Sequence, residues 1–219
     1  MNKTRIEGLS DGVFSIVMTL LILDIKVPQL NGVSVTNQEL WQRLADQGPI
    51  FRSYFISFVV IGMYWISHHA FFHLYARQVN RVVANINIVF LMFLAFIPFS
   101  AHLLGEYHRN EAAIAVYGMN IIGIGLALFS TFRIVIRNKE LAHENVSRRL
   151  IIQGTIRVLL PPGFALLAIF VAYVNIPFSL FLFAFPVLFN IIPGTLDFLE
   201  RLIFQRNDYG ISQQRKKTD

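Results

Sequence analysis

The chain contains no cysteine. Disulfide bonds, thiolate metal sites and cysteine nucleophiles are therefore excluded. It also contains no Walker phosphate-binding loop, no nucleophile elbow and no H-E-x-x-H motif. These are common signatures of enzymes that act on phosphate esters, acyl groups or peptide bonds. We therefore expect no enzymatic activity, no organic cofactor and no metal site.

Charged residues are scarce, at 15% of the chain against 55% hydrophobic residues, and the mean hydropathy is +0.55. Soluble domains carry about 25% charged residues. The composition predicts an all-α, multi-pass protein of the cell (inner or plasma) membrane, in contact with lipid. Long apolar runs predict six transmembrane helices, at residues 6–27, 50–74, 82–104, 112–132, 150–174 and 178–203. We expect one six-helix domain over 1–204 and a basic cytoplasmic tail over 205–219, predicted to be disordered.

The net charge of +6 is unevenly distributed along the chain. If successive loops alternate between the two sides of the membrane, 14 Lys and Arg residues lie on the side of both termini and four on the other, with Arg157 inside the fifth span. Cytoplasmic loops of membrane proteins carry such an excess of cations. This asymmetry predicts cytoplasmic termini, and it explains the positive charge without a nucleic-acid partner.

The first predicted span contains a carboxylate, Asp11, about one turn from its start. At that depth an unpaired carboxylate costs up to about 3 kcal/mol. At 100° per residue, one stripe of the helix collects Gly12, Ile16, Thr19, Leu20, Leu23 and Val27. The opposite side collects Asp11, Phe14, Met18, Leu21 and Ile25. Asp11 and Ser10 should therefore be bonded by neighbouring helices. The available partners are Trp65, the second-span histidines His68, His69 and His73, and the third-span asparagines Asn85 and Asn87.

The histidines of the second span allow two interpretations. His69 and His73 have the i, i+4 spacing that places two imidazoles on one helix face, as in some metal or haem sites. However, neither the second nor the third span offers a carboxylate as a third ligand. We favour buried histidines that are hydrogen-bonded to Asp11, Ser10 or Asn87.

Three local patterns lie outside the first span. Thr36 and Glu39 have the capping-box spacing, which predicts a short helix on the membrane surface within residues 29–49; a plain polar loop is the alternative. The run Pro161-Pro162-Gly163 predicts a kink or break in the fifth span. Arg157, in the same span, is predicted to snorkel to the cytoplasmic interface.

Two segments resemble a known family. The first is Arg5-x-x-x-Leu9-Ser10-Asp11-Gly12, followed by an aliphatic run and Asp24-Ile25-Lys26-Val27-Pro28. It is similar to the R-x-x-x-F-S-D signature of the transmembrane protein 175 family of potassium channels, with Leu9 in place of phenylalanine. The second comprises Trp65, His68-His69, Phe72, Asn87 and Phe96-Ile97-Pro98-Phe99, which resemble the second and third helices of the family. The resemblance covers about the first hundred residues.

The resemblance implies a weakly potassium-selective, leak-like cation channel built from six-helix repeats, with the first helix lining the pore. One repeat per chain implies a homotetramer, and permeant monovalent cations such as K⁺ are its ligands. Aliphatic side chains constrict and gate the pore, and the residues on this sequence are Ile16, Thr19, Leu20 and Leu23, with Asp24 at the mouth. The carbonyl filter T-V-G-Y-G is absent. Behind the pore, Arg5, Ser10, Asp11, Trp65, His68, His69 and Asn87 are implied to form a structural network.

Two other functions stay open. In a proton-coupled secondary transporter, Asp11 and the histidines of the second span would titrate, although the sequence has no visible inverted repeat. A purely structural membrane scaffold would carry no flux, with the aliphatic stripe facing lipid or another helix.

Overall fold

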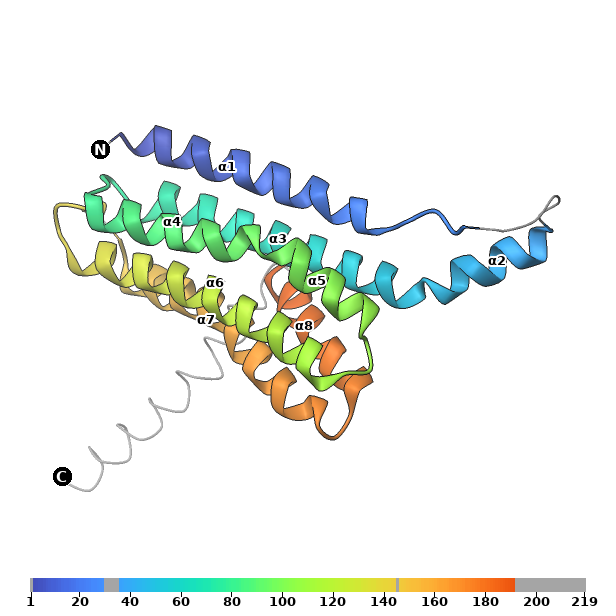
Figure 1. Ribbon diagram of the computed structural model, residues 1–219. Helices are drawn as coiled ribbons and strands as arrows, with labels where there is room; N and C mark the ends of the chain where they lie inside the picture. The colour runs from blue at the N-terminus through green and yellow to red at the C-terminus, as the bar shows by residue number, and fades with distance from the viewer. Residues whose placement is uncertain (1, 30–35, 145, 192–219) are drawn as a thin grey trace, which may run out of the picture.

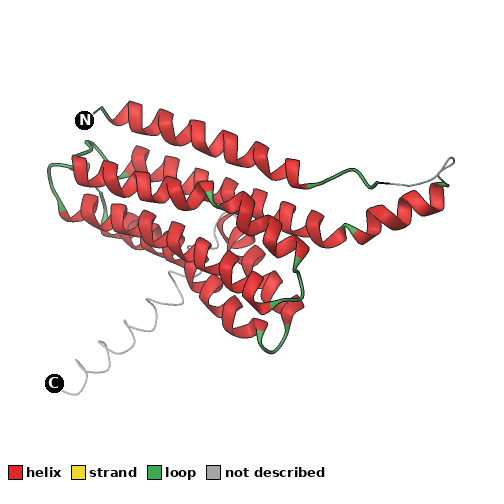
Figure 2. Cartoon of the chain, viewed as in Figure 1, coloured by secondary structure: helices red, strands yellow, loops and turns green. Residues whose placement is uncertain are grey.

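A computed structural model describes residues 2–29, 36–144 and 146–191, with side chains to residue 187. Its elements are α1 Lys3–Leu20, the 3₁₀ turn η1 Leu21–Asp24, α2 Asn37–Asp46, α3 Gly48–Leu74, α4 Arg81–Ala95, α5 Ile97–Glu106, α6 Glu111–Arg137, α7 Arg148–Ala172 and α8 Ile176–Ile191. Figures 1 and 2 show an all-helical chain, with no strand in the described part. This agrees with the predicted fold class.

Five segments of the described chain are long and apolar enough to cross a membrane: Lys3–Asp24, Gly48–Leu74, Arg81–Glu106, Glu111–Arg137 and Arg148–Ala172. They correspond to the first five predicted spans. The sixth, predicted over 178–203, begins in α8, which has a shorter apolar stretch over Ile176–Val187. The rest of that span and the predicted tail over 205–219 lie outside the described residues. The protein is thus a multi-pass helical membrane protein.

Most helices begin at a polar side chain that accepts a backbone N–H, the group that a helix start leaves unpaired. Asn2, Asn80, Asn110 and Ser147 cap α1, α4, α6 and α7 in this way. Thr36 caps α2, where its hydroxyl accepts from the Glu39 N–H at 3.2 Å. The predicted helix within residues 29–49 is therefore confirmed over the loop alternative. No residue of α2 is buried.

The proline-containing spans behave differently from one another. The third span divides into α4 and α5 at Phe96, and Pro98 lies in the first turn of α5, where its missing N–H costs nothing. The fifth span is not broken: α7 runs continuously through Pro161 and Pro162. Both prolines are buried, and a Cβ built on Gly125 of α6 would approach Pro162 Cγ to 2.6 Å. The absent side chain at Gly125 leaves room for the proline ring, so packing on α6 accommodates it.

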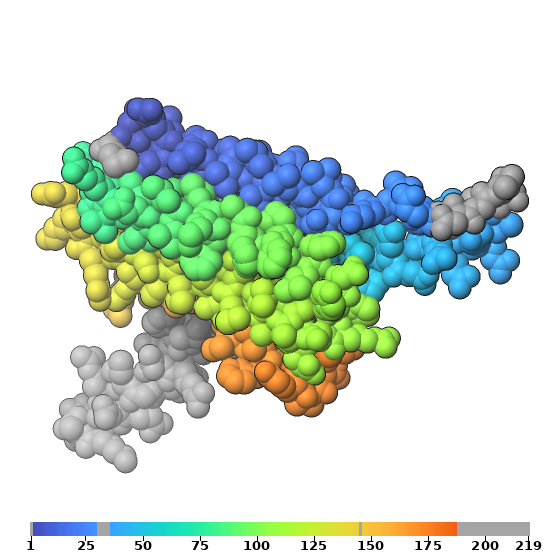
Figure 3. All heavy atoms as spheres, in the orientation of Figure 1, coloured from blue at the N-terminus to red at the C-terminus, as the bar shows by residue number. Residues whose placement is uncertain are grey.

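Within the bundle, α6 is central and α1 is peripheral. α6 contacts α4, α5 and α7, whereas α1 contacts mainly α3 and α4. In their most apolar stretches, 56% of the residues of α6 are buried but only 28% of those of α1. The residues Phe14, Val17 and Leu21 form the buried face of the first span. In Figure 3, this first span forms a ridge along one edge of the molecule, with its outer side uncovered.

The start of α1 and two loops meet at one end of the bundle. Lys3 Nζ donates to the Ala76 carbonyl at 3.0 Å, and the Arg77 N–H donates to the Leu141 carbonyl at 2.7 Å. The loops after α3 and after α6 therefore lie beside the N-terminus (Figure 1). Asp24, at the end of η1, lies near His102 of α5, toward the other end. Successive spans thus run in alternating directions, as a chain that crosses a membrane repeatedly must.

Candidate functional site

An aliphatic stripe on the first span is open to the surroundings. Ile16, Leu20 and Leu23 are 58%, 42% and 70% exposed, and Thr19 is exposed between them. They share one side because they are spaced near multiples of 3.6 residues, whereas Phe14, Val17 and Leu21 turn inward. The Thr19 hydroxyl donates to backbone carbonyls of its own helix, at 2.8 Å to Ile16 O and 3.1 Å to Ser15 O. Its oxygen lone pairs therefore remain available to an outside group.

The stripe begins nearer to the start of α1 than the sequence pattern of the first span suggested. Leu9 lies seven residues before Ile16, which places it within about 20° of the same line, and it is 55% exposed. The spacing of seven is the signal that would have found it. From Leu9 to Leu23 the stripe runs about 21 Å along the helix. We call Leu9, Ile16, Thr19, Leu20 and Leu23 the α1 stripe.

A buried hydrogen-bonded relay joins the other side of α1 to α3 and α4. Asn87 of α4 donates from Nδ2 to Ser10 Oγ at 3.0 Å, and its Oδ1 lies 2.9 Å from His68 Nε2. Because the amide oxygen accepts, Nε2 carries the proton. Ser10 donates in turn to the Ile6 carbonyl at 2.9 Å. All three side chains are buried, so the relay satisfies groups that would otherwise be unpaired in a low-dielectric interior. We call Ser10, Asn87 and His68 the polar relay.

The remaining residues of the predicted network lie at an exposed edge beside the relay. Trp65 Nε1 donates to Asp11 Oδ1 at 2.9 Å, and both side chains are exposed in the single chain. The ring of His69 stacks on Trp65, with centroids 6.1 Å apart, and makes no hydrogen bond to Asp11. Arg5 is exposed and has no hydrogen-bonded or ionic partner among the described residues. The predicted set is thus divided into a buried relay and an exposed Asp11–Trp65 pair.

A histidine faces the carboxylate at the end of the α1 stripe. Asp24 Oδ1 lies 3.7 Å from His102 Nδ1, an ion pair only when the imidazole is protonated. The two side chains border a pocket of about 470 Å³ at the junction of η1, α3 and α5. No sequence pattern singles out His102, because nothing local connects it to Asp24, a residue 78 positions earlier. In the described chain, no three His, Asp or Glu side chains come together as a metal site.

The geometry can be compared with known proteins. Residues 5–98 match the family model described as "Endosomal/lysosomal potassium channel TMEM175". A potassium channel of Streptomyces collinus is 41% identical over 132 residues, which are 58% of this chain and 62% of the relative. The chicken endosomal/lysosomal proton channel TMEM175 is 34% identical over 148 residues, which are 66% of this chain and 29% of the relative. The match therefore spans less than two thirds of either relative.

A solved structure extends the likeness over most of the fold. The crystal structure of a lysosomal potassium-selective channel TMEM175 homolog from Chamaesiphon minutus superposes with a TM-score of 0.73 at 27% sequence identity. The superposition covers 86% of this chain and 95% of the other. The α1 stripe, the polar relay and the Asp11–Trp65 pair all fall within the residues that match the family model. This chain belongs to the TMEM175 family, whose members are ion channels and not enzymes.

Proposed function

We propose that the protein is a weakly potassium-selective, leak-like cation channel in which four copies surround one axis, with the α1 stripe of each copy facing it. The observation that carries the proposal is the α1 stripe itself. The most exposed side of the first span is aliphatic over about 21 Å, while its other side is tied to α3 and α4 by buried hydrogen bonds. A ring of such stripes would enclose an apolar passage.

The constriction would work by excluding water. Four copies of Ile16, Leu20 and Leu23 form stacked apolar rings, and a narrow apolar passage closes to ions when it dewets. No plug is needed, because a small tilt of α1 widens or narrows all rings together. The polar relay supports this role by holding α1 to its own subunit, so that the helix moves as a unit.

Two polar groups along the stripe would act on the permeant ion. Four Thr19 oxygens could replace part of the hydration shell of K⁺, because their donors are already occupied within the helix. Asp24, at the end of the stripe, would attract cations to the mouth. Its neighbour His102 would weaken this attraction once protonated, because an ion pair at 3.7 Å would then offset the carboxylate charge.

The proposed orientation puts both termini in the cytoplasm of a cell membrane. Among the described residues, the end that holds the start of α1 and the loops after α3 and α6 carries nine Lys and Arg residues, and the opposite end carries four. The positive-inside rule favours the richer end as cytoplasmic. The mouth with Asp24 would then open on the outer side.

Cation flux through the purified protein in liposomes tests the function. We expect K⁺ flux to exceed Na⁺ flux modestly, to rise linearly with voltage and to be unaffected by an imposed pH gradient. The second candidate, a proton-coupled transporter, is favoured by the exposure of Asp11 and His69 at the edge beside the polar relay. It predicts saturable flux that depends on the pH gradient. Complete absence of flux would favour a structural scaffold and contradict the channel.

Replacing Asp11 with alanine should weaken assembly more than it changes ion preference. The change removes the acceptor of the 2.9 Å Trp65 bond from an exposed edge, where a neighbouring subunit would lie. We expect a loss of about 1 kcal/mol per subunit, measured as a lower tetramer fraction by size exclusion with light scattering. Asp46→Ala, which removes an exposed carboxylate from α2, is the matched control. A stable tetramer with altered K⁺ over Na⁺ preference would instead put Asp11 in the pathway.

A further inference from the structure

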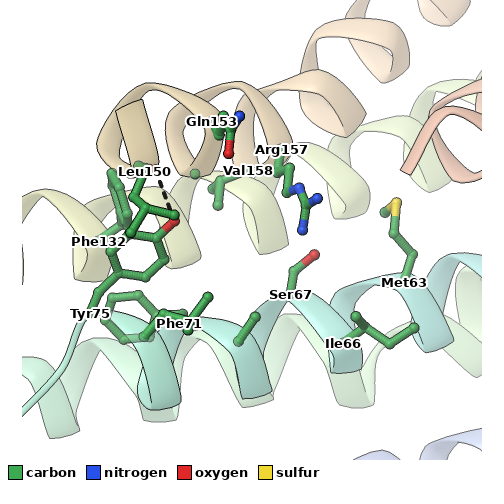
Figure 4. Close-up of a pocket in the computed structure, with 13 residues that line it drawn as sticks. Met63, Ile66, Ser67, Phe71, Tyr75, Phe132, Leu150, Gln153, Arg157 and Val158 are labelled. Atoms are coloured by element: carbon green, nitrogen blue, oxygen red, sulfur yellow. Dashed lines mark hydrogen bonds between the residues drawn. The ribbon is translucent and has the colours of Figure 1, made fainter. Parts of the chain in front are cut away.

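Arg157 lies in a pocket between α3 and α7 that belongs neither to the α1 stripe nor to the polar relay. The pocket has a volume of about 470 Å³, and its walls are mostly apolar. On the α3 side the wall includes Ile66, Ala70 and Leu74, and on the α7 side it includes Val158. Figure 4 shows Arg157 and Ser67 extending into the space from opposite walls.

Arg157 has no counter-ion among the described residues that line this pocket. It makes no hydrogen bond or ion pair with a described residue, and none of the described lining residues is a carboxylate. Tyr75 does not supply the missing negative charge. Burial raises the pKa of Tyr75, and its hydroxyl donates to the Leu150 carbonyl at 2.9 Å. A cation in a membrane-spanning helix is costly unless an anion or water reaches it. Arg157 is exposed to this pocket, so an anionic group that enters it would find an unpaired guanidinium.

The depth of Arg157 identifies the kind of anion. It is the tenth residue of α7, about 13 Å from the first residue. Figure 4 shows the guanidinium reaching across the pocket toward Ser67, which lies seven residues, about 10 Å, before Leu74, the last residue of α3. The group therefore lies within about 10 Å of the end of the bundle that holds the loop after α3. An anion that carries a hydrocarbon chain fits this place, because the chain can lie along the mostly apolar wall while the charged group meets the guanidinium.

We propose that the pocket binds an anionic phospholipid, with its phosphate on the Arg157 guanidinium and one acyl chain along the apolar wall of α3. A guanidinium binds phosphate through two parallel N–H···O bonds. An anionic headgroup is favoured over a zwitterionic one, because the quaternary ammonium of phosphatidylcholine would approach the cations Arg148 and Arg149 at the start of α7. This site does not depend on the proposed ion conduction.

Native mass spectrometry of the full-length protein in detergent tests the site, with phosphatidylglycerol and phosphatidylcholine as probes. We expect the wild type to prefer phosphatidylglycerol, and Arg157→Gln to weaken its binding about tenfold, the usual size of one lost charge-assisted contact. Arg81→Gln removes one exposed positive charge at the start of α4, away from the pocket and from the cations at the start of α7, so the preference should persist. Equal binding by the wild type and Arg157→Gln would overturn the proposal.

Two further variants separate the pocket from other sources of binding. Ser67→Leu fills the space opposite Arg157 without changing charge and should also weaken phosphatidylglycerol binding; unchanged binding would contradict the assigned location. The chain carries carboxylates at Asp197 and Glu200, beyond the described residues. If these carboxylates neutralise Arg157, the double variant Asp197→Asn, Glu200→Gln should tighten lipid binding severalfold. The partner of Arg157 would then be a carboxylate of this chain and not a lipid, which would overturn the proposal. Unchanged binding in this variant supports the lipid.

Discussion

Replacing Ile16 with asparagine should raise the basal K⁺ leak of reconstituted protein by about tenfold or more. A tenfold change corresponds to only about 1.4 kcal/mol, and the proposed ring contains four copies of the side chain. Ile16 is 58% exposed on the α1 stripe, so asparagine fits there without disturbing the core. Its amide would hold water in the constriction and remove the dewetted barrier. Leu23→Asn, at 70% exposure, should act in the same direction.

Ile22→Asn is the matched control for this prediction. Ile22 is an exposed aliphatic residue of the same span, about 120° away from the Ile16 line. It receives the same change in size and polarity but does not face the proposed axis. The measurement is K⁺ efflux from liposomes at equal amounts of assembled protein. Leak that stays at the wild-type level in both Ile16→Asn and Leu23→Asn, or that rises equally in Ile22→Asn, would remove the α1 stripe from the ion pathway.

Replacing Asn87 with leucine should destabilise the protein by about 2–4 kcal/mol, the cost of leaving buried polar groups unpaired. Asn87 donates to Ser10 and accepts from His68, so its loss leaves the His68 Nε2–H without an acceptor and the Ser10 oxygen without its donor. The polar relay is the buried hydrogen-bonded link from α1 to α4 and α3, so the first span should loosen before the rest of the bundle. Thermal melting in detergent measures the global effect, and proteolysis near the start of α1 measures the local one.

Asn120→Leu provides the comparison. Asn120 is also buried, but it makes one hydrogen bond, a 3.2 Å donation to Ser100, and its Oδ1 has no hydrogen-bond partner. Replacing it removes an unsatisfied group together with one weak hydrogen bond. The loss of stability should therefore be clearly smaller than in Asn87→Leu. Equal losses of stability in Asn87→Leu and Asn120→Leu would mean that the polar relay stabilises the fold no more than any buried asparagine does.

Patterns local to one helix were sufficient to predict most elements. Five of the six spans follow from apolar runs, and α2 follows from the spacing of Thr36 and Glu39. The α1 stripe follows from the 3.6-residue period alone. On a helix at the edge of the bundle, the side with large side chains packs inward, and the other side stays exposed. Leu9 was missed although the same period includes it.

Features that depend on a distant partner could not be predicted with certainty. The sequence offered both His68 and His69 as partners of the first span, and neighbouring residues on a helix point 100° apart. Only the packing of α3 against α4 turns His68 toward Asn87 and leaves His69 exposed. The predicted break in the fifth span is absent, and the sequence pattern could not include Gly125, which lies 37 residues before Pro162 and admits its ring.

The sequence by itself determined that this protein is a bundle of membrane-crossing helices whose first span has one aliphatic side and an acidic residue near its start. Both properties follow from composition and helical period, which require no knowledge of neighbours. The tertiary structure decided which groups satisfy the polar residues: Asn87 for Ser10, Trp65 for Asp11 and His102 beside Asp24. Hydrogen bonds and close packing act over a few ångströms, and residues far apart in sequence reach that distance only when the helices have assembled.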